Sequence, residues 1–156
     1  MTYHFQGERG DPPLLWLLLT LGYATPDAMK LLTTSMQTQR TVLVDIRSQP
    51  RSRWYPAWNR SALIARWRCR YLWKGDTLGN VHYKPEDRSK GIKLAAPERG
   101  VVEVVHLFQS GYQVILLCAC KYPESCHRLL VAKLVQEHLP GLLVHHLRSL
   151  VPVHPY

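Results

Sequence analysis

Short apolar runs alternate along the chain with segments whose apolar residues recur at helical spacing. The runs occupy residues 14–21, 41–47, 71–73, 114–118 and 142–147. Runs of this length that are rich in Leu, Val and Ile are typical of strands buried on both faces of a sheet. The run at 114–118 consists of five consecutive strongly apolar residues, and we expect it to form the central strand.

Between the runs, helix starts are marked by capping residues or proline. Thr25 precedes a Pro-Asp pair, Asn59 and Ser125 are N-cap candidates, and Pro97 opens a segment with helical periodicity. Strands that alternate with helices favour a parallel sheet covered on both faces. The pattern therefore predicts an α/β fold, a single three-layer domain with a mostly parallel central sheet of about five strands and helices on both faces.

The length of 156 residues suits one domain, which we assign to residues 14–150. Residues 1–13 are polar and are expected to form a flexible arm, and residues 151–156 a short tail. Residues 75–96 lack clear periodicity and are expected to be a long loop, a feature that is often functional. The apolar run at 14–21 is too short to span a bilayer. Only four cysteines are present, so we expect a cytoplasmic protein with reduced thiols and no membrane partner.

The excess of basic over acidic residues indicates what kind of ligand the protein binds. Twenty basic residues against 11 acidic ones give a net charge of +9 and a pI near 9.7, which suggests a polyanionic partner. The segment 46–75 contains many arginines, four of the five tryptophans and no acidic residue. Guanidinium groups neutralise phosphates and aromatic faces stack on unpaired bases, so this segment favours nucleic acid or a nucleotide as the ligand.

In parallel sheets the ligand lies at the carboxyl ends of the strands. In this chain those ends carry residues 22–23, 45–53, 73–74 and 118–128, so we expect one site there. The candidate phosphate-binding residues are Arg47, Arg51, Arg53, Arg128, Tyr23 and Lys74. The candidate base-stacking residues are Trp54, Tyr55 and Trp58.

Cys126, His127 and Arg128 are expected in the first turn of the helix that follows the central strand. Backbone N–H groups and the helix dipole at such a position bind anions and lower the pKa of a thiol. If the protein is an enzyme, the catalytic candidates are Cys126 as a nucleophile with His127 and Asp45. Asp45, near the end of a strand, could instead position an arginine.

A metal site is an alternative use of the same segment. Zinc or iron could be bound by Cys118, Cys126 and His127, with Cys120 or His82 as a further ligand. The spacing is not that of a standard zinc knuckle, and adjacent Cys and His ligands are hard to aim at one ion. Cys118 and Cys120 are also expected to point to opposite faces of their strand, so free buried thiols are the simpler interpretation.

Several segments together resemble a known family. They are LGYAT after the first strand, VDIRSQPRSR with the trailing Asn59, the Tyr71 strand followed by LGN, and LLCACKYPESCHR. Over residues 17–148 they resemble the bacterial domain of unknown function numbered 488. The resemblance implies a single α/β domain and supplies no activity. Cys120 stands where the resemblance implies a carboxylate in many members.

Three hypotheses about function follow. The first is binding of a phosphate-bearing ligand, nucleic acid or nucleotide, at the carboxyl ends of the strands, with thiol-assisted chemistry as an extension. The second is a cysteine-based metal-binding or redox protein. The third is a non-catalytic interaction module in which the tryptophan-rich turn docks a partner protein. No cofactor is required by the sequence under the first or third hypothesis.

Overall fold

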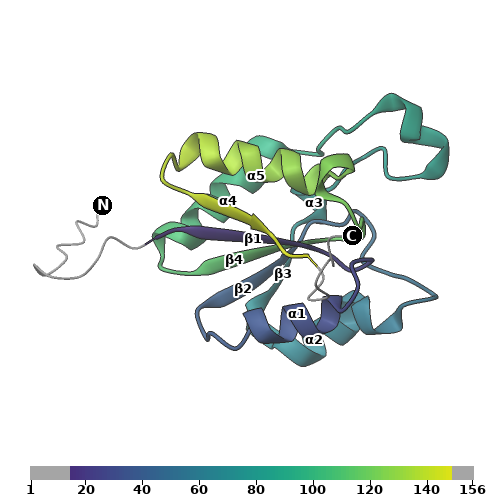
Figure 1. The fold of residues 1–156 in the computed structure, drawn as a ribbon. Helices are drawn as coiled ribbons and strands as arrows, with labels where there is room; N and C mark the ends of the chain where they lie inside the picture. Colours follow the sequence, from purple (N-terminus) through teal and green to yellow (C-terminus); the bar gives the residue numbers. More distant parts are fainter. Residues whose placement is uncertain (1–14, 149–156) are drawn as a thin grey trace, which may run out of the picture.

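The computed structural model describes residues 15–148, which form a five-stranded parallel sheet with helices packed against both faces (Figure 1). The strands are β1 (Leu17–Gly22), β2 (Thr41–Asp45), β3 (Tyr71–Trp73), β4 (Gln113–Cys118) and β5 (Leu143–His146). The α-helices are α1 (Ala28–Ser35), α2 (Arg60–Trp67), α3 (Gly75–Leu78), α4 (Pro97–Gln109) and α5 (His127–His138). The predicted α/β fold with a parallel sheet of about five strands is confirmed.

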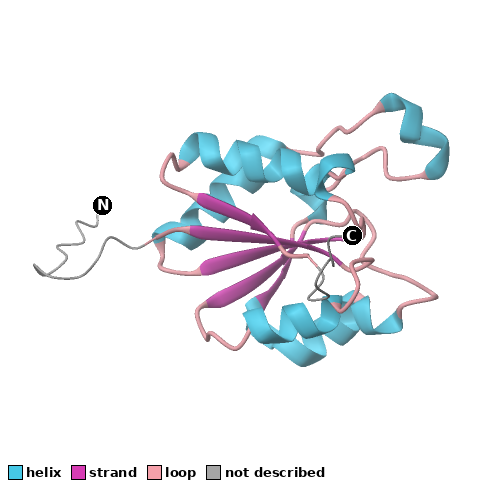
Figure 2. Ribbon diagram, in the orientation of Figure 1, coloured by secondary structure: helices cyan, strands magenta, loops and turns pink. Residues whose placement is uncertain are grey.

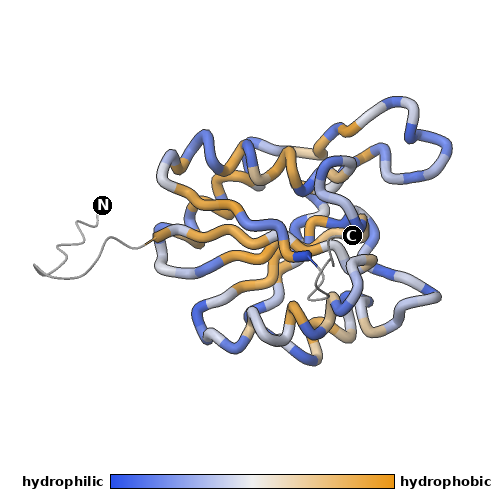
Figure 3. Tube along the Cα trace, viewed as in Figure 1, coloured by the Kyte–Doolittle hydropathy of each residue, from blue (hydrophilic) through white to orange (hydrophobic). Residues whose placement is uncertain are grey.

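The strand order is β3-β2-β4-β1-β5, and every neighbouring pair is parallel. The prediction that the apolar run at 114–118 forms the central strand is confirmed, because β4 lies in the middle and is buried from Val114 to Cys118. Figure 3 shows the strands as the most hydrophobic part of the chain.

Alternate residues of β4 face two separate apolar layers. Leu116 and Cys118 pack with residues of α4 and α5, including Phe108. Ile115 packs on the other side with residues of α1 and α2, including Leu32. Figure 2 shows these two helix layers on opposite sides of the sheet. This alternation decides that Cys118 points towards the layer that contains the start of α5.

The connection that follows β4 and the connections that follow its neighbours β1 and β2 lead to opposite faces of the sheet. The chain passes from β4 to α5 on one face, whereas the flanking strands β1 and β2 lead to α1 and α2 on the other face (Figure 1). A parallel sheet opens a crevice where neighbouring connections diverge in this way. The carboxyl end of β4, at Cys118, therefore lies at such a crevice.

Some local boundaries differ from the sequence predictions. The N-cap of α5 is Cys126, because Ser125 closes a short 3-10 turn, Pro123–Ser125. The N-cap of α1 is Asp27, in a left-handed conformation, and not Thr25. The predicted loop at 75–96 contains α3 and a 3-10 helix, Pro85–Lys90, which projects beyond the sheet in Figure 1.

The predicted arm at 1–13 and tail at 151–156 lie outside the described residues. Within residues 15–148, none of the helices combines the length and the apolar character needed to cross a bilayer.

Candidate functional site

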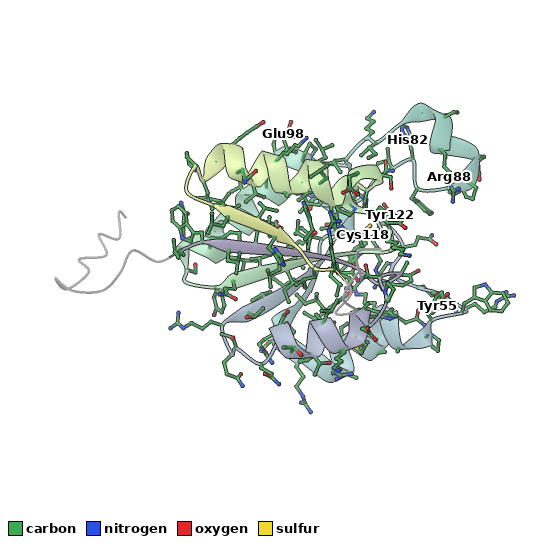
Figure 4. All side chains as sticks on the ribbon, viewed as in Figure 1. Tyr55, His82, Arg88, Glu98, Cys118 and Tyr122 are labelled. Atoms are coloured by element: carbon green, nitrogen blue, oxygen red, sulfur yellow. The ribbon has the colours of Figure 1, made fainter. Side chains whose placement is uncertain are left out.

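A groove runs along the carboxyl edge of the sheet as three adjoining cavities of about 600, 460 and 660 Å³. Gln49 lines all three cavities. We call the cavity of about 600 Å³ the cleft. Its floor includes Cys118, Cys120 and His127, and the loop that carries His82 and Arg88 borders it. In Figure 4 the labelled Cys118 lies at the sheet edge, with His82 and Arg88 on the projecting segment above it.

The groove is lined by basic side chains. The lining arginines are Arg47, Arg51, Arg53, Arg60 and Arg88. Within residues 15–148, no aspartate or glutamate lines any of these three cavities. These positive charges attract an anion electrostatically, whereas they add little to the binding of an uncharged ligand. The charge of the groove therefore favours an anionic ligand.

Arg47 is held by a buried network at the end of β2. Its Nε and Nη2 atoms donate to the two carboxylate oxygens of Asp45 at 2.8 and 2.7 Å. Nη2 also donates to the main-chain oxygen of Trp58 at 2.7 Å, and the Tyr71 hydroxyl donates to Asp45 at 2.6 Å. The Asp45 carboxylate is thus occupied by donors, and it acts here to position an arginine.

The Arg47 guanidinium stays charged in this setting. Burial works against its charge, but the hydrogen bond to Asp45 and the attraction of that carboxylate outweigh the burial and raise the pKa of Arg47. Among the described residues, its Nη1 atom makes no hydrogen bond, and the residue borders the cleft beside Tyr23. One edge of the guanidinium is fixed and the other is available to a ligand.

The turn after β2 presents basic and aromatic side chains to solvent. The main-chain N–H of Ser52 donates to the Asn59 side-chain oxygen, and the Ser52 hydroxyl accepts from the N–H groups of Trp54 and Tyr55. These bonds order the turn and leave Trp54 81% exposed. Figure 4 shows Tyr55 at the outer end of this turn.

Several predicted ligand residues are engaged inside the fold. Trp58 is buried and stacks on Tyr23, with ring centroids 5.7 Å apart, so its face is covered. Lys74 forms an ion pair of 2.6 Å with Glu103 and lines none of the three cavities. Arg128 is fully buried and donates to main-chain oxygens of Cys120 and Lys121. Its guanidinium supports the loop after β4 and does not line the groove.

Three thiols meet at the floor of the cleft. The Sγ atoms of Cys118, Cys120 and Cys126 all lie within 4.8 Å of one another, close enough to share a metal ion. The expectation that Cys118 and Cys120 point to opposite faces is wrong, because residues two apart along extended chain share a face and these Sγ atoms are 3.9 Å apart. All three thiols are free in the structure, so the interpretation as free buried thiols stays a prediction beside that of a metal site.

The thiols differ in acidity. Hydrogen bonds from Cys120 and Cys126 lower the pKa of Cys118 well below its ordinary value despite burial. The bond that Cys126 gives to Cys118, together with burial, raises the pKa of Cys126. The expectation that the helix start lowers the pKa of Cys126 is therefore wrong. The Cys126 side chain is 2% exposed and does not line the cleft.

His127 packs beside the thiols, and burial lowers the pKa of its imidazole. No hydrogen bond among the described residues joins Asp45 to Cys126 or to His127. The three predicted catalytic residues thus do not form a connected triad in this arrangement.

Sequence analysis did not single out two arginines of the groove as ligands, and it named His82 only as a further metal ligand. Arg60 lies at the start of α2 with its guanidinium over the Trp73 ring, and His82 and Arg88 come from the long segment between β3 and α4. Arg60 belongs to the segment at 46–75, which contains no acidic residue. The composition of that segment could therefore have identified Arg60 as a ligand candidate. For His82 and Arg88 the only signal was the unusual length of the predicted loop.

Comparison with known proteins gives one match. The model of the family described as "Domain of unknown function DUF488" matches residues 28–135, well over half of the chain. Neither the search of curated proteins nor that of solved structures found a match. The matched region includes every strand end that contributes to the groove except the end of β1.

Proposed function

The chain belongs to the DUF488 family of domains of unknown function, and we propose that it binds single-stranded nucleic acid along the groove at the carboxyl edge of its sheet. One observation carries the proposal: among the residues that the structure describes, five arginines and no carboxylate line the three adjoining cavities. Phosphate groups release counterions when they are neutralised by such side chains, which makes this lining favourable for a polyanion.

The continuity of the groove supports a strand of several nucleotides. Gln49 lies between the cleft, which Arg47 and Arg88 border, and the two cavities that Arg51 lines. Cavities of about 600 and 660 Å³ are each within the range of small-molecule sites. A backbone that crosses all three would place successive phosphates near different arginines.

The exposed aromatic residues support an unpaired strand over a duplex. Trp54 and Tyr55 are exposed on the turn that carries Arg51 and Arg53. Unpaired bases stack on such rings for about 1–3 kcal/mol each, whereas paired bases inside a duplex do not present their faces. The combination of arginines and exposed rings on one turn is typical of single-strand binding surfaces.

Fluorescence anisotropy with labelled oligonucleotides tests this function. We expect micromolar or tighter binding of a single-stranded 12-mer (a length on the order of one or two binding sites) and weaker binding of the matching duplex. Arg51→Ala and Arg53→Ala should each weaken binding about tenfold, a loss of about 1.4 kcal/mol. Both side chains are exposed, so the fold should not change.

Lys133→Ala is the matched control, because it removes one positive charge from an exposed position of α5 that lines none of the three cavities. Its affinity should stay within twofold of the unmodified chain. Equal losses in all three variants would mean that net charge alone attracts the oligonucleotide, and the groove would not be the site. Binding of mononucleotides with no gain for longer strands would overturn the polymer as the ligand.

A further inference from the structure

The thiol cluster has the dimensions of a metal site. Zinc binds thiolates at about 2.3 Å and imidazole nitrogens at about 2.0–2.1 Å in a tetrahedron, so neighbouring ligand atoms lie roughly 3.5–3.8 Å apart. The Cys118 and Cys120 Sγ atoms are 3.9 Å apart. The Nδ1 atom of His127 lies 3.7 Å from the Sγ atom of Cys118 and 3.8 Å from that of Cys126. These three separations match edges of such a tetrahedron, and the three Sγ atoms all lie within 4.8 Å of one another.

One separation is shorter. The Sγ atoms of Cys118 and Cys126 are 2.8 Å apart, and the Cys126 thiol donates its proton in a hydrogen bond to Cys118. A metal ion that replaces this proton would push the two sulfur atoms apart by about 1 Å to reach the tetrahedral edge. Cys126 is the N-cap of α5 and Cys118 ends β4, so a side-chain rotation at either residue can supply this movement.

The orientation of His127 is fixed for metal binding. Its Nε2 atom lies 2.9 Å from the main-chain oxygen of Ile46. A carbonyl oxygen only accepts hydrogen bonds, so Nε2 carries the proton and Nδ1 presents its lone pair to the thiols. Metal-binding histidines almost always donate their second ring N–H to a carbonyl or carboxylate in this way.

A buried charge beside the cluster has no counterion among the described residues. Arg128 is fully buried, and its hydrogen-bond acceptors are the neutral main-chain oxygens of Cys120 and Lys121. No carboxylate within residues 15–148 forms an ion pair with it. A buried charge without compensation is costly, and an arginine remains charged in proteins. A nearby group with a net negative charge would balance it.

We propose that Cys118, Cys120, Cys126 and the Nδ1 atom of His127 bind one zinc ion in a closed, four-ligand structural site. Each thiol releases its proton to solvent as its sulfur binds the ion. Three thiolates, one neutral imidazole and Zn²⁺ sum to a single negative charge, which balances Arg128. The ten residues from 118 to 127 contribute all four ligands, from a strand end, a turn and a helix start.

The position of Cys120 depends on the packing of its loop. Gly22, at the end of β1, leaves room for the main-chain oxygen of Cys120 and for Arg128, which a Cβ atom at position 22 would overlap. The bond from Arg128 to that oxygen then holds the turn against β1. Cys118, Cys120 and His127 also line the cleft, which gives the ion a route to the site. This inference is independent of nucleic-acid binding.

Metal analysis of the full chain tests the site directly. Protein purified without chelator or added metal should contain about one zinc ion per chain, as measured by inductively coupled plasma mass spectrometry. After the zinc is replaced by cobalt, the spectrum should show thiolate charge-transfer absorption and the intense d–d bands of a tetrahedral ion. Proton release should accompany binding when metal is added back to the stripped protein.

Variants separate the proposed ligands from other thiols. Cys120→Ser changes a half-buried ligand and should weaken zinc binding by about hundredfold or more, above the range typical for loss of an outer hydrogen-bond partner. His127→Gln should remove the histidine contribution to the cobalt spectrum. Cys69→Ser is the matched control, since Cys69 is exposed and outside the cluster, and it should leave zinc content unchanged. Circular dichroism checks that each variant is folded.

Three results would overturn the assignment. The first is metal-free protein whose cobalt complex lacks thiolate bands. The second is another metal, such as iron, at one per chain in place of zinc. The third is a chain mass lower by two hydrogens that maps to a Cys118–Cys126 disulfide in protein handled without reductant, which would make the cluster a redox pair.

Discussion

Asp45 and Arg47 form a buried, bidentate ion pair at the carboxyl end of β2, with donor–acceptor distances of 2.8 and 2.7 Å. The two residues are separated by a single residue, so the strand end itself builds the pair. Paired in this way, Arg47 keeps its charge beside the cleft and is held in one orientation. The pair therefore fixes the Arg47 guanidinium at the border of the cleft.

Asp45→Asn should lower the free energy of unfolding by about 3–5 kcal/mol, because it keeps the shape of the side chain but leaves the Arg47 charge buried and unpaired. Urea unfolding followed by tryptophan fluorescence measures the change. Asp87→Asn is the control, since Asp87 pairs with Lys90 at an exposed position and should change stability little. A similar small effect at both positions would show that the Asp45 pair contributes no more than a surface pair.

The Tyr71 hydroxyl should make stability sensitive to alkaline pH. Burial, followed by the neighbouring Asp45 charge, raises its pKa above the ordinary value of 10.0. Its contribution is therefore complete below about pH 10 and is lost as the pH rises further, because the unfolded chain releases the proton first.

Tyr71→Phe should cost about 1.5–3 kcal/mol at neutral pH through the lost hydrogen bond to a charged carboxylate. The gap in unfolding free energy between the two proteins should narrow above about pH 10. Urea unfolding at pH 7, 9 and 10.5 (values chosen roughly around that threshold) measures it. A gap that stays constant or widens at high pH would contradict the role assigned to Tyr71.

Two tryptophans on the same turn should behave oppositely. Trp54→Ala should weaken binding of single-stranded oligonucleotides by about 1–3 kcal/mol and leave stability unchanged, because its ring is 81% exposed. Trp58→Ala should instead destabilise the fold by about 3–5 kcal/mol, because its ring is buried against Tyr23. Anisotropy and urea unfolding on both variants measure the two effects. Equal binding losses in two stable variants would refute this division.

Gly22→Ala should destabilise the fold by about 1–3 kcal/mol or more, because the new Cβ overlaps the loop after β4. Gly141→Ala is the control: no atom lies within 4 Å of the added Cβ, and stability should stay the same or rise slightly. Thermal unfolding of both variants checks the prediction. If the variant at position 22 unfolds like the control, then the close approach of β1 and this loop is not required.

The sheet could be predicted from the sequence because each strand is a continuous apolar run. β4 is the clearest example, since a strand buried on both faces needs apolar residues at every position from Val114 to Cys118. The location of the groove followed from the same pattern, because parallel strands bring their carboxyl ends to one edge. Arg51 and Arg53 were expected there, and they do line it.

The roles of individual polar side chains could not be predicted in the same way. Arg128 and Arg51 are both arginines near strand ends, yet one is buried against main-chain oxygens and the other is exposed. That difference depends on tertiary contacts, such as the close approach of Gly22 to Cys120 and Arg128. Contacts of this kind produce no periodic pattern in the sequence. The convergence of the thiols was missed because Cys118 and Cys120 were assigned to opposite faces.

The most direct test of the central claim is the salt dependence of single-strand binding for the unmodified chain and for the Arg51→Ala/Arg53→Ala variant. A plot of the logarithm of the binding constant against the logarithm of salt concentration should fall steeply for the unmodified chain. Loss of two phosphate contacts should reduce the magnitude of the slope by about 1.4, at about 0.7 for each contact with a single strand. A flat plot, or identical slopes for both proteins, would contradict binding of nucleic acid in this groove.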